Sequence, residues 1–210
     1  MSGLKIPYLL DLLPNNPLDA SERLVASGAK LAIDKINWKD FSHTVDVKTY
    51  LGYTTKYLWL HFRVVNDIFK AVYTKDQDPV WQDSCVEFFV RHGDIYRNFE
   101  FNSIGVCLSA FGEGRQGRIS LDKESMAQIL RFPSLSSESL PEEGTTASWN
   151  LTVAIPLELI GLEPGDRFMA NFYKCGDETA IPHYISWSEI GTDTPDFHRP
   201  EYFGQVELVQ

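Results

Sequence analysis

Strict alternation of apolar and polar side chains, with few helical stretches between the alternating segments, most restricts how this chain can fold. In residues 57–65 every second side chain from Leu58 to Val64 is apolar. Neighbouring side chains of a strand point to opposite faces, so this period predicts a strand buried on one face. Further strands are predicted at residues 45–48, 84–90, 96–107, 148–155, 167–175 and 202–209. We therefore predict an all-β fold, an antiparallel β-sandwich of the immunoglobulin-like or jelly-roll type with one or two short helices.

The chain has 210 residues, and sandwiches of this size commonly form one unit. We predict a single domain over residues 1–210. Residues 1–30 are expected to form an N-terminal extension with a short helix. Residues 113–143 contain two glycines, several serines and two prolines, which predicts a surface insertion with a short helix at 122–130.

The charge balance restricts the partners of this chain. Its 29 acidic residues outnumber 19 basic residues, which gives a formal net charge of −10. Such a field repels phosphate groups, so we expect no nucleic-acid partner and no attraction to anionic membranes. Neutral ligands such as sugars are compatible with this charge, and the sequence leaves protein partners unknown.

Cysteine usage and the N-terminus bear on the compartment. The three cysteines, Cys85, Cys107 and Cys175, are widely spaced and odd in number, which favours small buried side chains over a disulfide framework. The first residues have no long apolar run and include Pro7, which predicts neither a signal peptide nor a membrane span. The chain is cytoplasmic as written, or extracytoplasmic if a leader was removed.

Polar side chains gather on one face of a predicted β-hairpin formed by residues 84–90 and 96–102. Strand alternation places Glu87 on the face opposite its apolar neighbours, and Glu100 and Asn102 on the corresponding face of the second strand. Antiparallel pairing with the apolar faces turned to the core brings these three side chains together. Polar groups arranged in this way contact a ligand, a cation or water.

Two tryptophans near this hairpin are candidates for stacking on a ligand. Trp81 precedes the first hairpin strand, and Trp187 precedes a long polar loop. An indole face buries area against the CH surface of a sugar while its N–H stays free. The alternative is packing, because tryptophan is usually mostly buried. Trp38, Trp59 and Trp149 lie in or beside apolar patterns and are predicted to belong to the core.

Five motifs follow one another between residues 30 and 210. They are Trp81-x-Asp83-Ser84-x-Val86-Glu87-x-Phe89, Phe99-x-x-Asn102, Trp149 with Ile155-Pro156, Ser186-Trp187, and Phe197-His198-x-Pro200 with Phe203-Gly204. In this order they resemble the family 9 carbohydrate-binding modules, within the DOMON-like β-sandwich superfamily. Members of that family hold a sugar, in the best-known cases its reducing end, between two tryptophans, with charged and amide side chains on the hydroxyls.

The resemblance implies a set of ligand-binding residues. Trp81 and Trp187 correspond to the two clamp tryptophans, Glu87 to the acidic hydrogen-bonding residue and Asn102 to the amide on the next strand. One position departs from the family pattern, because Glu100 stands where the resemblance implies an arginine. A carboxylate only accepts hydrogen bonds whereas a guanidinium only donates them, so the ligand pattern changes. Glu100 joins the predicted site.

Two neighbouring carboxylates need a cation or a shared proton. Arg63, Arg97 and Lys174 are the candidate cations, and an ion pair of Glu87 with Arg63 or Lys174 is the structural alternative to ligand binding. His183, close to Trp187 in sequence, joins Arg63 and Lys174 as an expected supporting residue.

We predict non-catalytic binding of a mono- or oligosaccharide. The alternative is a glycan-active hydrolase or lyase that uses Glu87 and Glu100, because glycosidases need two carboxylates and cross-strand neighbours stand roughly 5 Å apart at Cβ. A domain that binds no small ligand and only contacts other proteins is the third reading. The sequence contains no nucleophile elbow, zinc-protease motif or phosphate-binding glycine loop, which favours a binding protein over an enzyme.

No cofactor and no catalytic metal is predicted. Asp76, Asp78 and Asp83 lie close in sequence and leave a structural calcium ion open. Haem ligation by methionine and histidine occurs in the related superfamily. It is disfavoured here because methionine more often fills gaps in a core.

Overall fold

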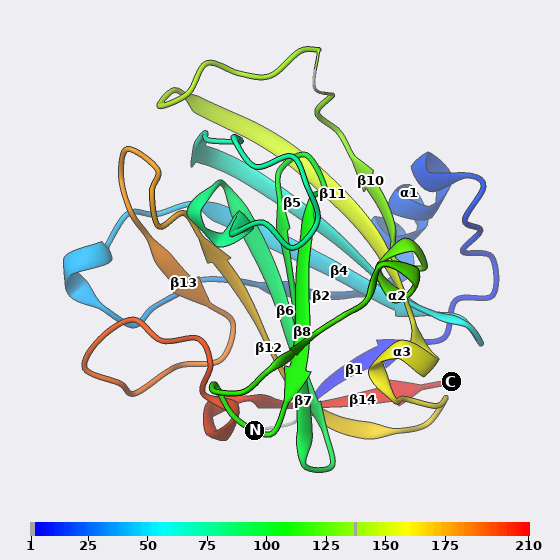
Figure 1. Cartoon of the computed structure of the whole chain (residues 1–210). Coiled ribbons are helices and arrows are strands. Elements are labelled where there is room, and N and C mark those ends of the chain that lie inside the picture. Colours follow the sequence, from blue (N-terminus) through cyan, green and yellow to red (C-terminus); the bar gives the residue numbers. More distant parts are fainter. Residues whose placement is uncertain (1–2, 137) are drawn as a thin grey trace.

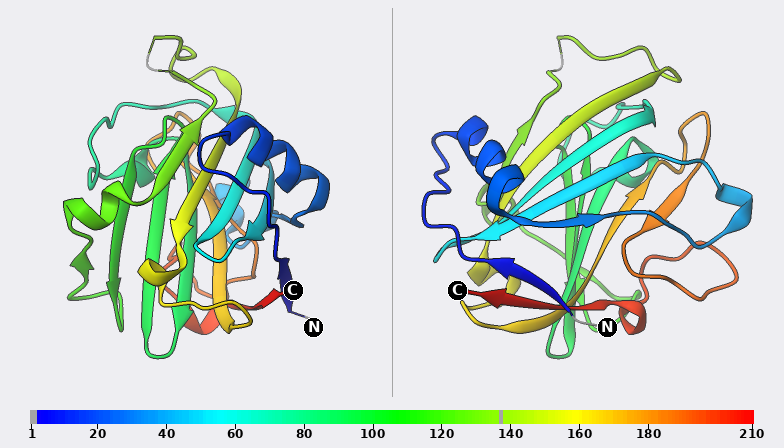
Figure 2. Two further views of the ribbon diagram at one scale, coloured as in Figure 1. Left: turned by 90° about the vertical axis from the view of Figure 1, so that its right-hand side faces the viewer. Right: turned by 180° about the vertical axis from the view of Figure 1, so that it is seen from behind.

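Two β-sheets pack face to face in the computed structural model, which describes residues 3–136 and 138–210 (Figures 1 and 2). Strands dominate and the helices are short. The strand pairings given by the described residues are antiparallel, with β1 and β14 as a parallel exception. The predicted all-β antiparallel sandwich is confirmed.

The larger sheet contains the predicted polar hairpin. Its order is β1 (Leu4–Pro7), β14 (Gly204–Val209), β12 (Arg167–Cys175), β6 (Cys85–His92), β7 (Ile95–Asn102), β8 (Cys107–Gly112) and β9 (Ile119–Ser120). Off this path, β13 (Tyr184–Ser186) pairs with the end of β12 and with β3 (Lys35–Ile36). The paired strands β12, β6, β7 and β8 therefore form a continuous surface.

The second sheet covers one face of the first. Its order is β10 (Leu130–Pro133), β11 (Thr146–Pro156), β5 (Tyr57–Ile68), β4 (Asp46–Tyr53) and β2 (Ala29–Ala32). The helices are α1 (Pro17–Ser27), α2 (Lys123–Ala127) and α3 (Leu157–Ile160), with 3₁₀ turns η1 (Lys39–Phe41), η2 (Val80–Gln82) and η3 (Pro200–Tyr202). In the described part of the chain each helix is too short or too polar to cross a bilayer.

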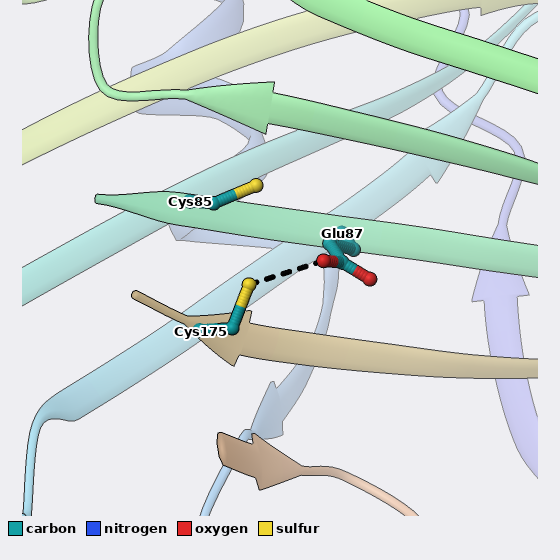
Figure 3. A group of neighbouring side chains, drawn as sticks. All are labelled: Cys85, Glu87 and Cys175. Carbon is teal, nitrogen blue, oxygen red and sulfur yellow. Dashed lines mark hydrogen bonds between the residues drawn. The ribbon is translucent and has the colours of Figure 1, made fainter. Parts of the chain in front are cut away.

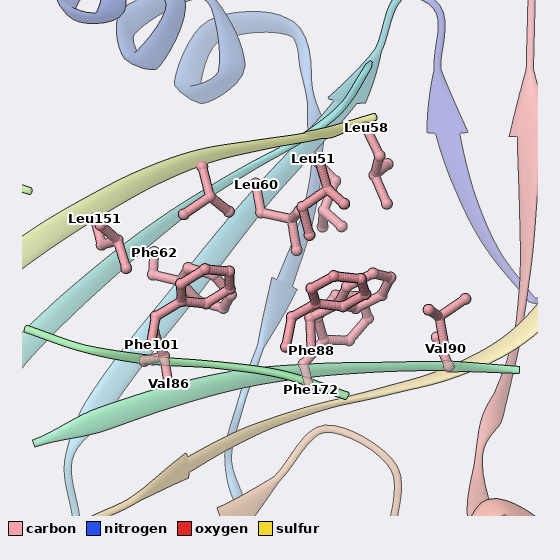
Figure 4. Close-up of a cluster of buried hydrophobic side chains, with 14 of the residues drawn as sticks. Leu51, Leu58, Leu60, Phe62, Val86, Phe88, Val90, Phe101, Leu151 and Phe172 are labelled. Atoms are coloured by element: carbon pink, nitrogen blue, oxygen red, sulfur yellow. The ribbon is translucent and has the colours of Figure 1, made fainter. Parts of the chain in front are cut away.

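The main core lies between the sheets, where the inward faces of β5 and β6 meet (Figure 4). Phe62 from β5 and Phe88 from β6 are fully buried, as their alternation predicts. Phe88 also stacks on Phe172 of β12, with ring centroids 5.2 Å apart. Each large apolar side chain buried here contributes roughly 1.5–3 kcal/mol. Because alternate side chains of β6, β7 and β12 pack in this core, the side chains between them point to the outer face of the sheet.

The segment predicted as one strand over residues 96–107 is two strands. β7 ends at Asn102 and β8 begins at Cys107, with a tight turn between them. In this turn the Gly105 N–H donates to Asn102 O at 2.9 Å, and the Asn102 N–H donates to Val106 O at 3.1 Å. Gly105 adopts a φ of 81°, which glycine tolerates without strain. The chain therefore reverses where the sequence pattern suggested continuation.

The two peripheral segments contribute to both sheets. The predicted N-terminal helix is present as α1, where Asn16 accepts a hydrogen bond from the Asp19 N–H at 3.4 Å. The N-terminal extension also supplies β1, which pairs with β14. Residues 113–143 supply β9, α2 and the edge strand β10. Part of the predicted surface insertion therefore belongs to the two sheets. Its helix, Lys123–Ala127, is shorter than the predicted 122–130.

Other burial predictions are confirmed. Trp38, Trp59 and Trp149 have relative exposures of 6%, 0% and 1%. The three cysteines are buried, and in the described part of the chain they are free thiols.

Candidate functional site

A cavity of about 370 Å³ opens on the outward face of the larger sheet. Its floor consists of outward side chains from β12, β6, β7 and β8, and its walls come from loops. The lining residues are Trp81, Glu87, Asn98, Glu100, Leu108, Ala110, Arg115, Arg118, Cys175, Asp177, Tyr184, Pro195, Asp196, Phe197 and His198. The volume falls within the roughly 300–1,000 Å³ typical of small-molecule sites.

The predicted hairpin brings two carboxylates to this floor. β6 and β7 pair in the register that sets Glu87 directly opposite Glu100, so the predicted juxtaposition of these two residues is confirmed. Val86 and Phe88 point into the core, which turns Glu87 to the other face. Glu87 and Glu100 are only 3% and 4% exposed. The sheet thus holds two acidic groups under the cavity and away from bulk water.

Burial weakens the acidity of both carboxyl groups, and neighbouring carboxylates add to this effect. Burial raises the pKa of Glu87 well above its ordinary value, and the neighbouring charge of Glu100 raises it further. Burial also raises the pKa of Glu100 to about 7, against the opposing effects of Asn98 and Arg118. The Asn98 side-chain amide donates to Glu100 Oε1 at 2.9 Å. Near neutral pH the pair therefore retains a proton and offers both a donor and acceptors.

Each carboxyl group has a distinctive contact. The Cys175 thiol donates to Glu87 Oε1 at 3.1 Å. Glu100 Oε2 is buried and finds no hydrogen-bond partner among the described residues. A buried acceptor without a partner is costly, so Glu100 is poised to accept a hydrogen bond from a group that enters the cavity.

The structure corrects the predicted cations. Arg63 is exposed on β5, in the opposite sheet. Arg97 lies outside the cavity, with its guanidinium 5.9 Å from the Phe111 ring centroid. Lys174 points between the sheets, where its Nζ lies 3.0 Å from Asp67 Oδ1. Strand alternation carried the signal for Lys174, because it shares a face with Phe172 of the core.

His183 belongs to the same interior cluster as Lys174. Its Nε2 lies 2.8 Å from Lys174 Nζ, and its side chain is fully buried. Burial and the adjacent Lys174 charge lower the pKa of His183 to about 3, so the ring is neutral. The Trp149 indole N–H donates to Asp67 Oδ2 at 2.8 Å and closes the network. These residues join the two sheets and do not line the cavity.

Arg118, which sequence reasoning missed, is a cation of the cavity wall. Its guanidinium carbon lies 3.9 Å from the Tyr96 ring centroid, a cation–π contact. It donates to Asn98 Oδ1 and to Ala110 O. Arg118 lies in the irregular segment before β9, where no periodicity indicates the direction of a side chain. Arg118 reaches the cavity that Glu87 and Glu100 line because the segment 113–143 folds back over the larger sheet.

The two predicted clamp tryptophans lie in different environments. Trp81, on η2, lines the cavity and is partly buried. Trp187 packs on the core instead, edge-to-face with Phe172 at 5.6 Å between centroids. Its ring lies so close to Gly204 that a Cβ at Gly204 would stand 2.6 Å from it. The aromatic side chain that lines the cavity from this part of the chain is Tyr184, three residues earlier.

Asn102 lies outside the cavity and has a structural environment. Its Nδ2 donates to Tyr73 O at 2.9 Å and to Asp83 Oδ2 at 3.1 Å, and its Oδ1 accepts from the Val106 N–H at 2.9 Å. These bonds attach the loop before η2 to the β7–β8 turn. In the sheet Asn102 stands opposite Cys85, and its amide bonds to other groups of the protein.

The three aspartates considered as ligands of a structural calcium ion have separate partners. Asp83 accepts hydrogen bonds from the loop residues Val72 and Tyr73. Asp76 forms an ion pair with Arg131, and Asp78 accepts from the Lys75 N–H. Within residues 3–136 and 138–210 these carboxylates do not form a cluster of ligand atoms.

Together, these observations define a β-sandwich with a cavity of small-molecule size on the outward face of one sheet. The model of the carbohydrate-binding family 9 matches residues 21–208, and the chain belongs to this family. The family resemblance derived from the sequence motifs is confirmed.

Solved structures extend this comparison. A Bacteroides uniformis protein described as a candidate carbohydrate-binding protein is 29% identical, with a TM-score of 0.84 over 99% of this chain and 100% of that chain. A family 9 module of Caldicellulosiruptor kristjanssonii in complex with cellotriose is 13% identical, with a TM-score of 0.61 over 98% of this chain and 92% of that one. A structure of a family 9 module from the same organism in complex with glucose is 14% identical, with a TM-score of 0.55 over 98% and 95%. The last two show a shared fold. Comparison with curated proteins finds no significant match.

Proposed function

We propose that this protein binds a saccharide non-catalytically in the cavity on the larger sheet. The observation that carries the proposal is that one cavity combines aromatic side chains, two buried carboxyl groups and a guanidinium. Sugars present CH surfaces and hydroxyl groups together, and these lining groups complement both. Membership of the family and the glucose and cellotriose held by the Caldicellulosiruptor modules support this class of ligand.

Trp81 and Tyr184 are the proposed aromatic contacts. Both line the cavity, Trp81 from η2 and Tyr184 from β13, so a sugar ring in the cavity has access to each. This arrangement retains the first tryptophan of the predicted clamp and replaces Trp187 by Tyr184. Asn102 then acts indirectly, by holding the loop that leads to Trp81.

Glu87, Glu100 and Arg118 are the proposed polar contacts. Glu100 has a buried acceptor oxygen without a partner among the described residues, and Arg118 adds a donor-only group to the cavity lining. Each sugar hydroxyl exchanges bonds with water for bonds with protein, with a net gain of about 0.5–1.5 kcal/mol per bond. We therefore expect a dissociation constant on the order of micromolar to millimolar.

Isothermal titration calorimetry with glucose, cellobiose and cellotriose tests the proposal. Saturable binding by the native chain is expected, with a loss of about 2 kcal/mol, or roughly thirtyfold, in Trp81→Ala. Ala110→Trp is a second variant, which fills the cavity without removing a polar group. Normal binding in both variants, with their folding verified by circular dichroism, would place the ligand elsewhere.

The same incubations address the glycosidase alternative. Reducing ends and products are measured over time with cellotriose and longer glycans, with Glu87→Gln and Glu100→Gln as controls. The proposal predicts no product above the level of the variants. Turnover that either substitution abolishes would establish catalysis instead.

A further inference from the structure

Three side chains with metal-ligating atoms converge below the cavity (Figure 3). Cys85 and Glu87 lie on the outward face of β6, and Cys175 of β12 stands directly opposite Cys85. The two sulfur atoms and one Glu87 oxygen all lie within 4.8 Å of one another, and all three residues are buried. Two cross-strand cysteines and a carboxylate thus occupy one small volume.

This donor set selects a particular class of ion. Thiolates are soft ligands and favour ions such as Zn²⁺, whereas Mg²⁺ and Ca²⁺ prefer sites composed of oxygen atoms. Zn²⁺ takes four ligands, and sites with three protein ligands leave the fourth position to water or substrate. Because Glu87 and Cys175 also line the cavity, an ion would have a route of entry to these side chains through it.

A second observation points to a cation at the same place. Glu100, directly opposite Glu87, has its Oε2 buried without a partner among the described residues. Asp177 adds a further acidic group to the cavity lining. Buried charges are normally paired or coordinate metals. Among the described residues, the Arg118 guanidinium donates to Asn98 and to backbone carbonyl groups, and Arg115, which also lines the cavity, pairs with Asp196. A cation held by Glu87 would compensate this acidic floor, and Glu100 could accept a hydrogen bond from its bound water.

We propose that Cys85, Glu87 and Cys175 bind one thiophilic divalent cation of the Zn²⁺ class at the floor of the cavity. Both thiols, and Glu87 where it carries the proton of the carboxyl pair, release their protons to solvent when the ion binds, and no oxidation state changes. The site stands independently of the proposed saccharide, because the three ligands all come from the protein.

Titration of the reduced, metal-free chain with Co²⁺ tests this site, with a phosphine reductant present. One equivalent is expected to produce the thiolate-to-cobalt charge-transfer absorption and the intensified visible bands of tetrahedral Co²⁺, and Zn²⁺ is expected to displace it. Cys85→Ala and Cys175→Ala should each abolish the charge-transfer signal of the native site. Cys107→Ala is the matched control, because Cys107 is equally buried but faces the core between the sheets.

The native chain alone can overturn the proposal, even if a variant fails to fold. Absence of a thiolate absorption band at saturating Co²⁺, with no protons released into weak buffer, would exclude the site. Retention of the full signal in folded Cys85→Ala and Cys175→Ala would assign it to other residues. None of these readouts includes a sugar, so failure here is distinct from failure of saccharide binding.

Discussion

Glu87 and Glu100 stand directly opposite each other on two antiparallel strands, and both lie on the floor of one cavity. The core packing of Val86 and Phe88 requires this outward direction for Glu87. The acidic pair is therefore a consequence of the sandwich itself. Burial of the two carboxyl groups raises the pKa of each of them, and the strands that carry them are regular.

Tyr184 rather than Trp187 is predicted to support binding of the ligand. Tyr184→Ala should weaken saccharide binding at least about tenfold, because it removes an aromatic wall of the cavity. Trp187→Phe should leave affinity unchanged and lower the free energy of unfolding, because Trp187 packs on Phe172. Calorimetric titration and urea denaturation measure the two effects. A loss of binding confined to Trp187→Phe would restore the two-tryptophan clamp.

Glu100→Gln is predicted to stabilise the protein at alkaline pH. Burial raises the folded-state pKa of Glu100 to about 7, above its unfolded value near 4.3. The folded state therefore binds more protons than the unfolded state between these values, and stability falls as pH rises through this window at up to about 1.4 kcal/mol per pH unit. The substitution should remove this loss, which makes the variant more stable than the native chain at pH 8 and similar at pH 4.

Urea denaturation in the presence of EDTA at several pH values measures this difference, and EDTA excludes an effect of bound metal. Parallel stability curves for Glu100→Gln and the native chain would show that Glu100 does not titrate differently in the folded state.

Lys174→Met is predicted to be strongly destabilising, although Lys174 does not line the cavity. Lys174 and Asp67 form an ion pair in which both side chains are fully buried. Removing one partner leaves a buried charge uncompensated, at a cost of about 3–5 kcal/mol. The double variant Asp67→Asn with Lys174→Met should lose less than the sum of the two single variants. Guanidinium denaturation gives the coupling energy, and strict additivity would contradict an interaction between the two residues.

His61 is predicted to contribute to acid destabilisation. Burial, with a smaller effect of Arg63, lowers the pKa of His61 to about 4. Between about 6.5 and 4 the unfolded chain binds a proton that the folded chain excludes, so stability falls with falling pH by up to about 1.4 kcal/mol per unit. His61→Gln should flatten the stability curve in this window. Urea denaturation from pH 7 to pH 4 tests this, and an unchanged slope would contradict it.

The two-residue alternation of side chains along each strand explains which parts of the site were predictable. The alternation in β6 and β7 indicated that Glu87 and Glu100 share a face, because two-residue periodicity is a property of the strand itself. The same reasoning, applied to β12, would have directed Lys174 inward beside Phe172. The family motifs pointed to Trp81, which does line the cavity.

The sequence by itself determined the main strands, the buried face of the sandwich and the acidic hairpin, because these depend on nearest neighbours along the chain. It did not show the chain reversal between β7 and β8. The tertiary structure decided that Tyr184 and Arg118 line the cavity and that Trp187 packs on the core. It also placed Cys85 opposite Cys175 across ninety positions of sequence. These placements depend on how β12 pairs with β6 and how the irregular loops return over the sheet. No local period encodes such long-range contacts.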